Sequence, residues 1–164
     1  MKHLAKLLKR HISRIVLMAC VLTFALPTLA DDLPDYQIEG AGTGSQGTYL
    51  VRVSVLSKKS KVSDDEIGRC AIHGVLFRGF ASKENRQQQK PLAGSPMVEM
   101  QQKAFFDDFF KSAYQNYYQM VSGSRQVVKA GKQYKVTSVV TVSKDQLRKD
   151  LVAADVIKGL NTGF

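Results

Sequence analysis

The chain has 164 residues, 44% of them hydrophobic and 23% charged, and a formal net charge of +10 at pH 7. The first fourteen residues carry five basic and no acidic side chains, so the rest of the chain has a net charge of only +5. That charge is ordinary for a soluble domain and gives little support for nucleic-acid binding. Beyond the first thirty residues the sequence has one cysteine, which excludes an internal disulfide.

The first thirty residues predict a secretory signal peptide. A basic segment is followed by twelve apolar residues, 15–26, and then by Thr-Leu-Ala at 28–30, whose small residues suit a cleavage site. Twelve residues form a helix of about 18 Å, too short for a hydrocarbon core of about 30 Å. We therefore expect an exported chain that starts at Asp31 and has no integral membrane span. Lipidation at Cys20 is the alternative, because residues 17–20 form a loose lipobox, but an apolar run follows that cysteine instead of a polar tether.

Residues 31–47 are polar and glycine-rich and predict an extended arm. Gly42 to Gly47 match the pattern G-x-G-x-x-G of dinucleotide-binding loops, which follow a strand and open a helix whose N-terminus holds the pyrophosphate. Here the glycines instead precede a predicted strand, 48–56, in which tyrosine and three valines occupy alternate positions. We therefore interpret the glycines as a flexible lead-in to that strand.

The next predicted element is a helix that begins at Ser63 and ends near Phe77. Ser63 and Glu66 form a capping box, and the acidic residues of the first turn suit the helix dipole. A basic loop, 58–61, precedes this helix, and we interpret it as a solvated connection.

A long polar loop, 82–94, follows the helix. A loop of this length inside a small domain is either functional or mobile. Its basic and amide side chains are therefore the candidate partner-binding residues, namely Arg86, Gln87, Gln88, Gln89 and Lys90. A mobile insertion is the alternative.

A second predicted helix, 96–122, has Ser95 as its cap and ends at Gly123. Its phenylalanines and tyrosines recur at helical spacing along one side. We interpret this aromatic stripe as a contact with the core, with the tyrosine hydroxyls at its rim. The alternative is a platform for a small ligand.

Two strands, 126–129 and 133–142, form a predicted hairpin joined by a short glycine-containing turn. A third predicted helix, 143–158, starts with a capping box of Ser143 and Gln146 and ends at a lysine followed by a glycine.

The order strand, helix, loop, helix, hairpin, helix predicts an α+β fold in a single domain, 48–164. We expect a two-layer sandwich with an antiparallel or mixed sheet of about three strands. The three helices then cover one face, because the alternating strands indicate a sheet with one solvated face.

One pair of residues has the spacing for chemistry. Cys70 and His73 lie three residues apart on a predicted helix and could act as nucleophile and base, or as half of a metal site. A zinc site needs three or four ligands, and no further cysteine or histidine follows the leader. Free cysteine is more often a buried apolar residue. The acidic clusters at 64–66 and 107–108 do not suggest paired acid–base catalysis. We therefore predict no catalytic, cofactor or metal site, and no enzyme activity.

Two segments carry a resemblance to known proteins: "GTYLVRVSVLSKKSK…AIHGVLFRGF" and "YKVTSVVTVSKDQLRKDLVAADVIKGL". They resemble a group of short secreted proteins of Bacteroidales bacteria that have no assigned activity. The succession of strand, helix and strand into "SKDQLRKDL" is also similar to the small α/β modules of envelope accessory proteins, including the curli-secretion lipoprotein CsgG and the flagellar protein FlgT. The resemblance implies a Gram-negative envelope context and carries no functional residues.

Export without recognisable chemistry predicts a non-enzymatic envelope accessory module that binds a partner protein. The expected location is the periplasm or the outer membrane, or outside the cell. The contact would use the loop 82–94, the glycine-rich arm or an exposed sheet edge. The alternatives are a small secreted thiol-dependent hydrolase that uses Cys70 and His73, and a carrier that binds a small ligand along the aromatic helix, 96–122.

Overall fold

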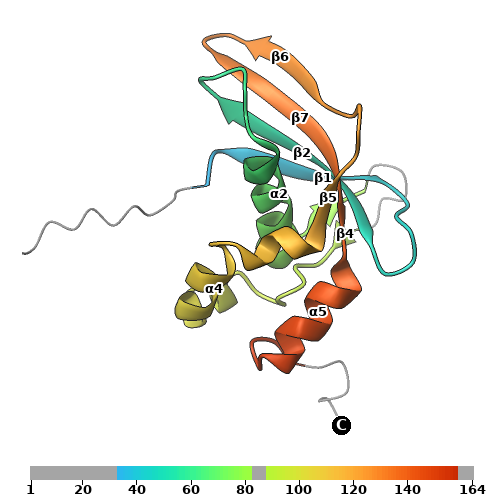
Figure 1. The fold of residues 1–164 in the computed structure, drawn as a ribbon, viewed down its shortest axis with the longest axis vertical. Coiled ribbons are helices and arrows are strands. Elements are labelled where there is room, and N and C mark those ends of the chain that lie inside the picture. Colours follow the sequence, from blue (N-terminus) through green and yellow to red (C-terminus); the bar gives the residue numbers. More distant parts are fainter. Residues whose placement is uncertain (1–32, 83–87, 159–164) are drawn as a thin grey trace, which may run out of the picture. The chain divides into compact units, whose positions relative to one another are not determined.

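The computed structural model describes residues 33–82 and 88–158, which belong to one compact unit that begins at Leu33 (Figure 1). The predicted signal peptide and the candidate lipidation site Cys20 lie outside the described residues. Helices combined with an antiparallel sheet confirm the predicted α+β class. Among the described residues, no helix has the length and apolar character needed to span a membrane.

The main sheet has five strands in the described part of the chain, instead of about three. All its pairings are antiparallel, so the mixed alternative does not occur in it. Two central strands pair along their length, one strand adds to one side, and two short strands share the other side. In spatial order these are β1 (Tyr36–Gly42), β2 (Tyr49–Ser57), β7 (Gln133–Val142), and then β5 (Tyr118–Met120) and β6 (Gln126–Ala130), both on β7.

The three strands that the sequence predicted are present as β2, β6 and β7. In β2 and β7 the alternation is the reason, because period-2 spacing turns every second side chain toward the same face. The inward residues of the two central strands are fully buried: Val51, Val53, Val55, Val136, Ser138, Val140 and Val142. This valine-rich face forms one wall of the core.

Strand β1 corrects the prediction of an extended arm over 31–47. Tyr36 pairs opposite Val55 and Ile38 opposite Val53, with an irregularity in the register between Gly40 and Gly42. Only two large apolar residues mark this strand, which is too weak a pattern to predict from sequence. Pairing with β2 supplies the stabilisation that the local sequence lacks.

Helix α2 (Asp64–His73) packs against the valine-rich face and contacts β2, β5 and β7. Its predicted cap is confirmed, because Ser63 Oγ accepts a hydrogen bond from the N–H of Glu66 at 3.0 Å. Ile67, Cys70 and Ala71 point into the core. The helix continues as a π-helical turn, η1 (Gly74–Arg78), which brings the helical segment to its predicted end.

The predicted long helix 96–122 is wrong in its extent. The segment contains α3 (Met97–Gln101), α4 (Lys103–Phe109), the 3-10 turn η2 (Ala113–Tyr117) and then strand β5. Pairing of β5 with β7 outweighs the helical spacing of the aromatic residues, because helix propensity is weak compared with tertiary contacts. Gly123 lies beyond β5 with a positive φ of 72°, in a turn rather than at a helix end.

The last helix, α5 (Lys144–Ala153), is shorter than the predicted 143–158. Ser143 precedes it, but its side chain makes no capping hydrogen bond. Gln146 Nε2 instead donates to the Asp150 carboxylate at 2.8 and 2.9 Å. The predicted capping box is therefore absent. The helix ends at the turn before Asp155, which has a left-handed backbone with a φ of 56°.

Candidate functional site

The predicted partner-binding residues fall partly within the described chain. Arg86 and Gln87 lie outside the described residues. Gln88 and Gln89 form β4, which pairs with β3 (Phe80–Ala81). The Tyr49 hydroxyl donates to Gln89 Oε1 at 3.2 Å, so this side chain faces the domain.

The polar loop is attached to the domain again after Lys90. The N–H groups of residues 92 and 93 donate to the carbonyl groups of Val75 and Leu76 at 2.9 and 3.0 Å. These bonds attach the end of the polar loop to the segment after α2, and the Lys90 side chain before them is exposed.

Cys70 is a fully buried side chain on α2. Burial, with a contribution from the Glu66 carboxylate, raises the pKa of its thiol to about 12. A thiol with that pKa stays protonated at neutral pH, and the thiolate is the nucleophile in cysteine chemistry. The geometry therefore favours the interpretation of Cys70 as a core residue.

His73 uses both ring nitrogens, with partners other than Cys70. Its Nδ1 lies 2.5 Å from the Tyr36 hydroxyl, and its Nε2 lies 3.1 Å from Glu99 Oε1. Burial raises the pKa of the Tyr36 phenol, so the phenol stays protonated and donates to Nδ1. The remaining ring proton then belongs on Nε2 and is donated to Glu99. Sequence reasoning missed both partners, because they come from β1 and α3.

The hydrogen bonds from His73 to Tyr36 and Glu99 connect α2 to β1 and α3. A substrate would have little access to this imidazole. The His73 side chain is 12% exposed, and Phe77 and Phe110 pack on it with ring centroids 5.1 and 6.0 Å away. The Arg78 guanidinium lies 4.1 Å from the centroid of the Tyr36 ring. Burial lowers the pKa of His73, while Glu99 opposes this effect, so the imidazole is neutral at pH 7. The described residues contain no cluster of three or more His, Cys, Asp or Glu that could hold a metal ion.

The aromatic residues of the predicted second helix fill the core. The ring centroids of Phe77 and Phe106 are 4.9 Å apart, and those of Phe109 and Phe110 are 5.1 Å apart. Phe106 and Phe109 are buried, which confirms the core interpretation of the stripe even though the helix is interrupted. Rings that contact one another give no support to a ligand platform.

A hollow of about 330 Å³ lies beside the glycine-rich turn between β1 and β2. Its walls are Gly40, residues 42–50 of the turn and the start of β2, and Phe80, Ser82, Gln89 and Lys144. The start of α5 therefore meets the glycine-rich turn at this point.

The contact between this turn and α5 has the wrong polarity for phosphate binding. The N–H of Asp145 donates to the carbonyl oxygen of Gly47 at 3.1 Å, and the Lys144 ammonium lies 5.0 Å from the Tyr49 ring centroid. A phosphate-binding loop leaves amide groups free at a helix N-terminus for the anion. Here a carbonyl group occupies the helix start, in agreement with a turn that only connects two strands.

Comparisons with protein-family models, with curated proteins and with solved structures found no match for this chain. The resemblance to secreted Bacteroidales proteins and to the CsgG and FlgT modules therefore stays a hypothesis. A function has to follow from the surfaces that the described residues present.

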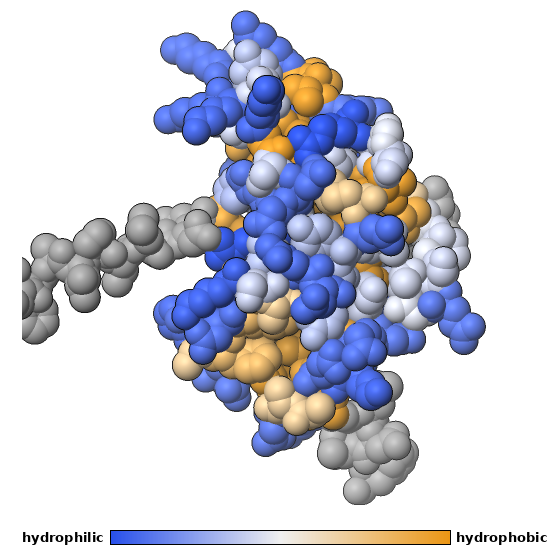
Figure 2. Space-filling view, in the orientation of Figure 1, coloured by the Kyte–Doolittle hydropathy of each residue, from blue (hydrophilic) through white to orange (hydrophobic). Residues whose placement is uncertain are grey.

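One such surface is the outer edge of β6. Every residue of this strand is exposed, and within the described chain it pairs with β7 alone. Val127 and Val128 are 46% and 60% exposed. Figure 2 shows hydrophobic atoms among hydrophilic ones at the end of the molecule where Figure 1 places β6 and β7.

Strands β5 and β6 follow the same edge of β7 and are separated by the turn at 121–125. The N–H of Val121 donates to the Val139 carbonyl at 3.0 Å, and Ser124 Oγ accepts from the Val139 N–H at 2.9 Å. Arg125 next to it donates to the carbonyl of Val62 at 2.7 Å and pairs with Asp64. These bonds attach the start of β6 firmly, so its open edge is held in place.

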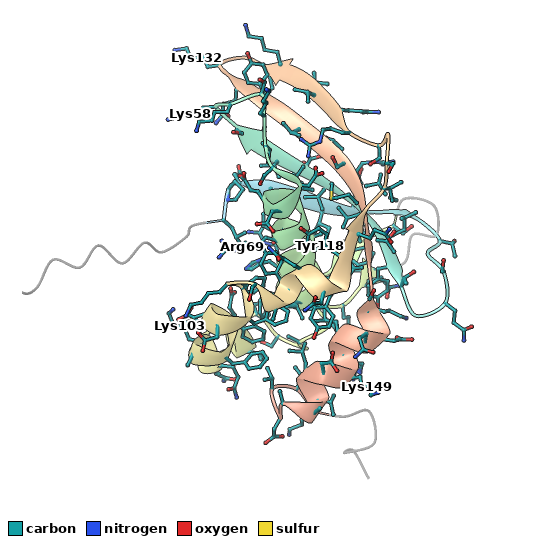
Figure 3. All side chains as sticks on the ribbon, in the orientation of Figure 1. Lys58, Arg69, Lys103, Tyr118, Lys132 and Lys149 are labelled. Carbon is teal, nitrogen blue, oxygen red and sulfur yellow. The ribbon has the colours of Figure 1, made fainter. Side chains whose placement is uncertain are left out.

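The second surface is a group of lysines at one end of the main sheet, which we call the basic end. The pairing of Ser57 and of Lys129 with Tyr134 brings the loop after β2 beside the β6–β7 turn. Figure 3 shows Lys58 and Lys132 at this same end. The basic end consists of six exposed lysines, Lys58, Lys59, Lys61, Lys129, Lys132 and Lys135. The sequence interpretation of 58–61 as a solvated connection missed this group, because it forms only when β2 pairs with β7.

Proposed function

We propose that this protein is an exported, non-enzymatic accessory module that binds a partner protein of the cell envelope through the open edge of β6. The exposed strand carries the proposal. An exposed edge presents unpaired backbone N–H and C=O groups, to which an extended segment of a partner can add as a further strand. Val127 and Val128 would provide apolar contacts for alternate side chains of that segment.

The contrast with the opposite edge supports this choice. On β1, Ser82 forms a bridge to Gly40, and the Arg78 guanidinium donates to the Tyr36 carbonyl at 3.1 Å. Natural sheet edges are commonly protected in such ways, because open edges invite unwanted pairing. Among the described residues β6 has no such cover, which fits an edge that is kept for binding.

The polar loop is the second contact in this proposal. Gln88 and Lys90 are exposed, and Arg86 and Gln87 precede them in the chain. Export by the predicted signal peptide, 1–30, would place the module in the periplasm, at the outer membrane or outside the cell. An N-terminus at Asp31, measured by mass spectrometry of the exported protein, checks that part of the proposal.

Site-specific cross-linking in cells tests the contact. A photo-reactive amino acid at Gln126 should give one discrete adduct, identified by mass spectrometry as an envelope protein. Val127→Thr with Val128→Thr should abolish the adduct, because threonine keeps the strand propensity and removes the apolar contact. Both valines are exposed, so the free energy of unfolding should change by only about 0.5 kcal/mol.

The matched control is a pair of exposed methionines on α3. Met97 and Met100 are 65% and 81% exposed, and Met97→Gln with Met100→Gln should leave the adduct unchanged. An adduct that is lost in the methionine variant and retained in the valine variant would move the contact to α3. Adducts obtained from Lys90 but not from Gln126 would move it to the polar loop.

A further inference from the structure

We propose that the basic end docks on the surface of a membrane that contains anionic phospholipids. This goes beyond the proposed partner binding, because it assigns a second binding surface with a different ligand. The segments 57–62 and 126–136 contribute all six lysines and contain no aspartate or glutamate. None of the ion pairs between described residues involves these lysines. Their charge is therefore available to an external anion.

The acidic groups near the basic end leave this charge in place. Asp35 precedes β1, and its backbone carbonyl accepts a hydrogen bond from Leu56 at 2.9 Å. Asp64 is already paired with Arg125. The described segments that form the basic end thus carry six ammonium groups and no carboxylate of their own.

The chemistry of the side chains favours a lipid surface over nucleic acid. Single-stranded nucleic acid is usually held by exposed aromatic rings and by arginine, which stack on bases or bind phosphate through a planar fork. The basic end has lysines, and its one ring, Tyr134, is half-buried. Lysine is a compact point charge that is attracted to a diffuse anionic surface without needing a shaped pocket.

Exposed apolar side chains beside the lysines point to the same ligand. Val127 and Val128 lie next to Lys129 on β6, and Val128 pairs opposite Lys135. Basic residues combined with exposed apolar side chains are typical of proteins that lie on a membrane surface. Because both proposed contacts use Val127 and Val128, a bound partner segment and a membrane would compete for these two side chains.

Vesicle flotation tests the proposal. The protein is expressed from the full sequence and purified as the cells process it. Binding to vesicles of phosphatidylglycerol and phosphatidylcholine in equal parts should be strong and should weaken as salt is added. Binding to pure phosphatidylcholine vesicles should be at background. Each lysine near an anionic surface contributes about fivefold in affinity, so Lys58→Gln, Lys59→Gln and Lys132→Gln together should reduce binding about a hundredfold.

A charge-matched variant separates the basic end from net charge. Lys103→Gln, Lys149→Gln and Lys158→Gln remove the same charge elsewhere. Figure 3 shows Lys103 and Lys149 away from Lys58 and Lys132. This variant should bind within about twofold of the parent protein if location matters. Equal losses in both triple variants would overturn the proposal in favour of a non-specific charge effect. The circular dichroism of both variants should match that of the parent.

A spectroscopic readout reports contact directly. The sequence contains no tryptophan, so Val128→Trp introduces a single indole at an exposed position of β6. Its emission should shift to shorter wavelength with the anionic vesicles. The shift should vanish when Lys58→Gln, Lys59→Gln and Lys132→Gln are also present. An unshifted emission with vesicle-bound protein would overturn docking through this end.

Two competition experiments distinguish a membrane surface from other anionic ligands. Glycerol phosphate should not displace the protein from vesicles, because a single headgroup cannot engage several lysines, and displacement would indicate a discrete phosphate site instead. A single-stranded oligonucleotide that binds more tightly than the vesicles, with the same dependence on Lys58, Lys59 and Lys132, would assign the surface to nucleic acid and overturn the proposal.

Discussion

Burial lowers the pKa of His73, the one histidine beyond the predicted leader, and Glu99 opposes this effect only in part. Below about pH 6.5 the unfolded chain gains a proton that the folded chain resists, so the free energy of unfolding falls as pH decreases. The stabilisation is complete above that pH. Gln can accept from Tyr36 and donate to Glu99, so His73→Gln should remove this part of the pH dependence. Chemical denaturation at about pH 7.5 and about pH 5.5 measures it, and equal pH dependences in both proteins would contradict the assignment.

Cys70 gives a second prediction for a single residue. A buried thiol whose pKa is raised to about 12 should react slowly with iodoacetamide at neutral pH, and denaturant should accelerate labelling to the rate of a free thiol. Fast labelling of the native protein would instead support the alternative of a thiol-dependent hydrolase. The sequence could predict the burial of Cys70 because it follows Ile67 on the apolar side of a helix.

The partners of His73 could not be predicted in the same way. Tyr36 and Glu99 lie 37 and 26 residues away along the chain. No local spacing connects three positions on a strand and two different helices. The hydrogen bonds of the network depend on the tertiary arrangement, so a sequence pattern indicates only that His73 shares a helix face with Cys70.

Among the elements, α2 and β5 fit together at a glycine. A Cβ at Gly68 would lie 2.1 Å from Cζ of the Tyr118 ring, and Figure 3 places Tyr118 beside this helix. Alanine gains about 1 kcal/mol in helix propensity, but overpacking of this kind costs about 1–3 kcal/mol. Gly68→Ala should therefore destabilise the protein in thermal or chemical unfolding. In a Tyr118→Ala background the same change should be neutral or stabilising, and an unchanged cost there would refute the steric explanation.

The interrupted second helix shows where element prediction fails. Tyr114 and Gln115 donate to the Asp65 carboxylate at 2.6 and 2.8 Å, and Tyr118 begins a strand. Asp65 belongs to the first turn of α2, where the sequence explains it fully as a favourable charge at a helix start. Asp65 also holds the 3-10 turn in place, and this second role cannot be predicted from the local sequence around it.

At the scale of the molecule, the unit that begins at Leu33 contains the described core. A chain that starts at Asp31 should therefore fold without the leader and unfold in one cooperative transition. Far-ultraviolet circular dichroism reports the backbone, and the fluorescence of the six tyrosines, all of them in the described helical and strand segments, reports the packing. Transitions that do not coincide would show that this unit does not unfold in a single cooperative step.

The size of the sheet explains the largest error in the predicted architecture. The central strands place valine at most of their inward positions over nine or ten residues, and this signal is strong enough to identify them. The edge strands β1 and β5 have seven and three residues and few apolar side chains. Their strand conformation depends on hydrogen bonding to a neighbouring strand that is already in place. A prediction from local sequence therefore finds fewer strands than the sheet contains.

The unequal edges of the sheet set a limit on self-assembly. Growth of strands into a fibre requires each added copy to offer a fresh edge at its far side. In this protein the far side is β1, where Ser82 and Arg78 already occupy backbone groups. Two copies that met through β6 would consume both open edges at once. Association along the hydrogen-bond ladder therefore ends with a closed pair and does not continue as a polymer.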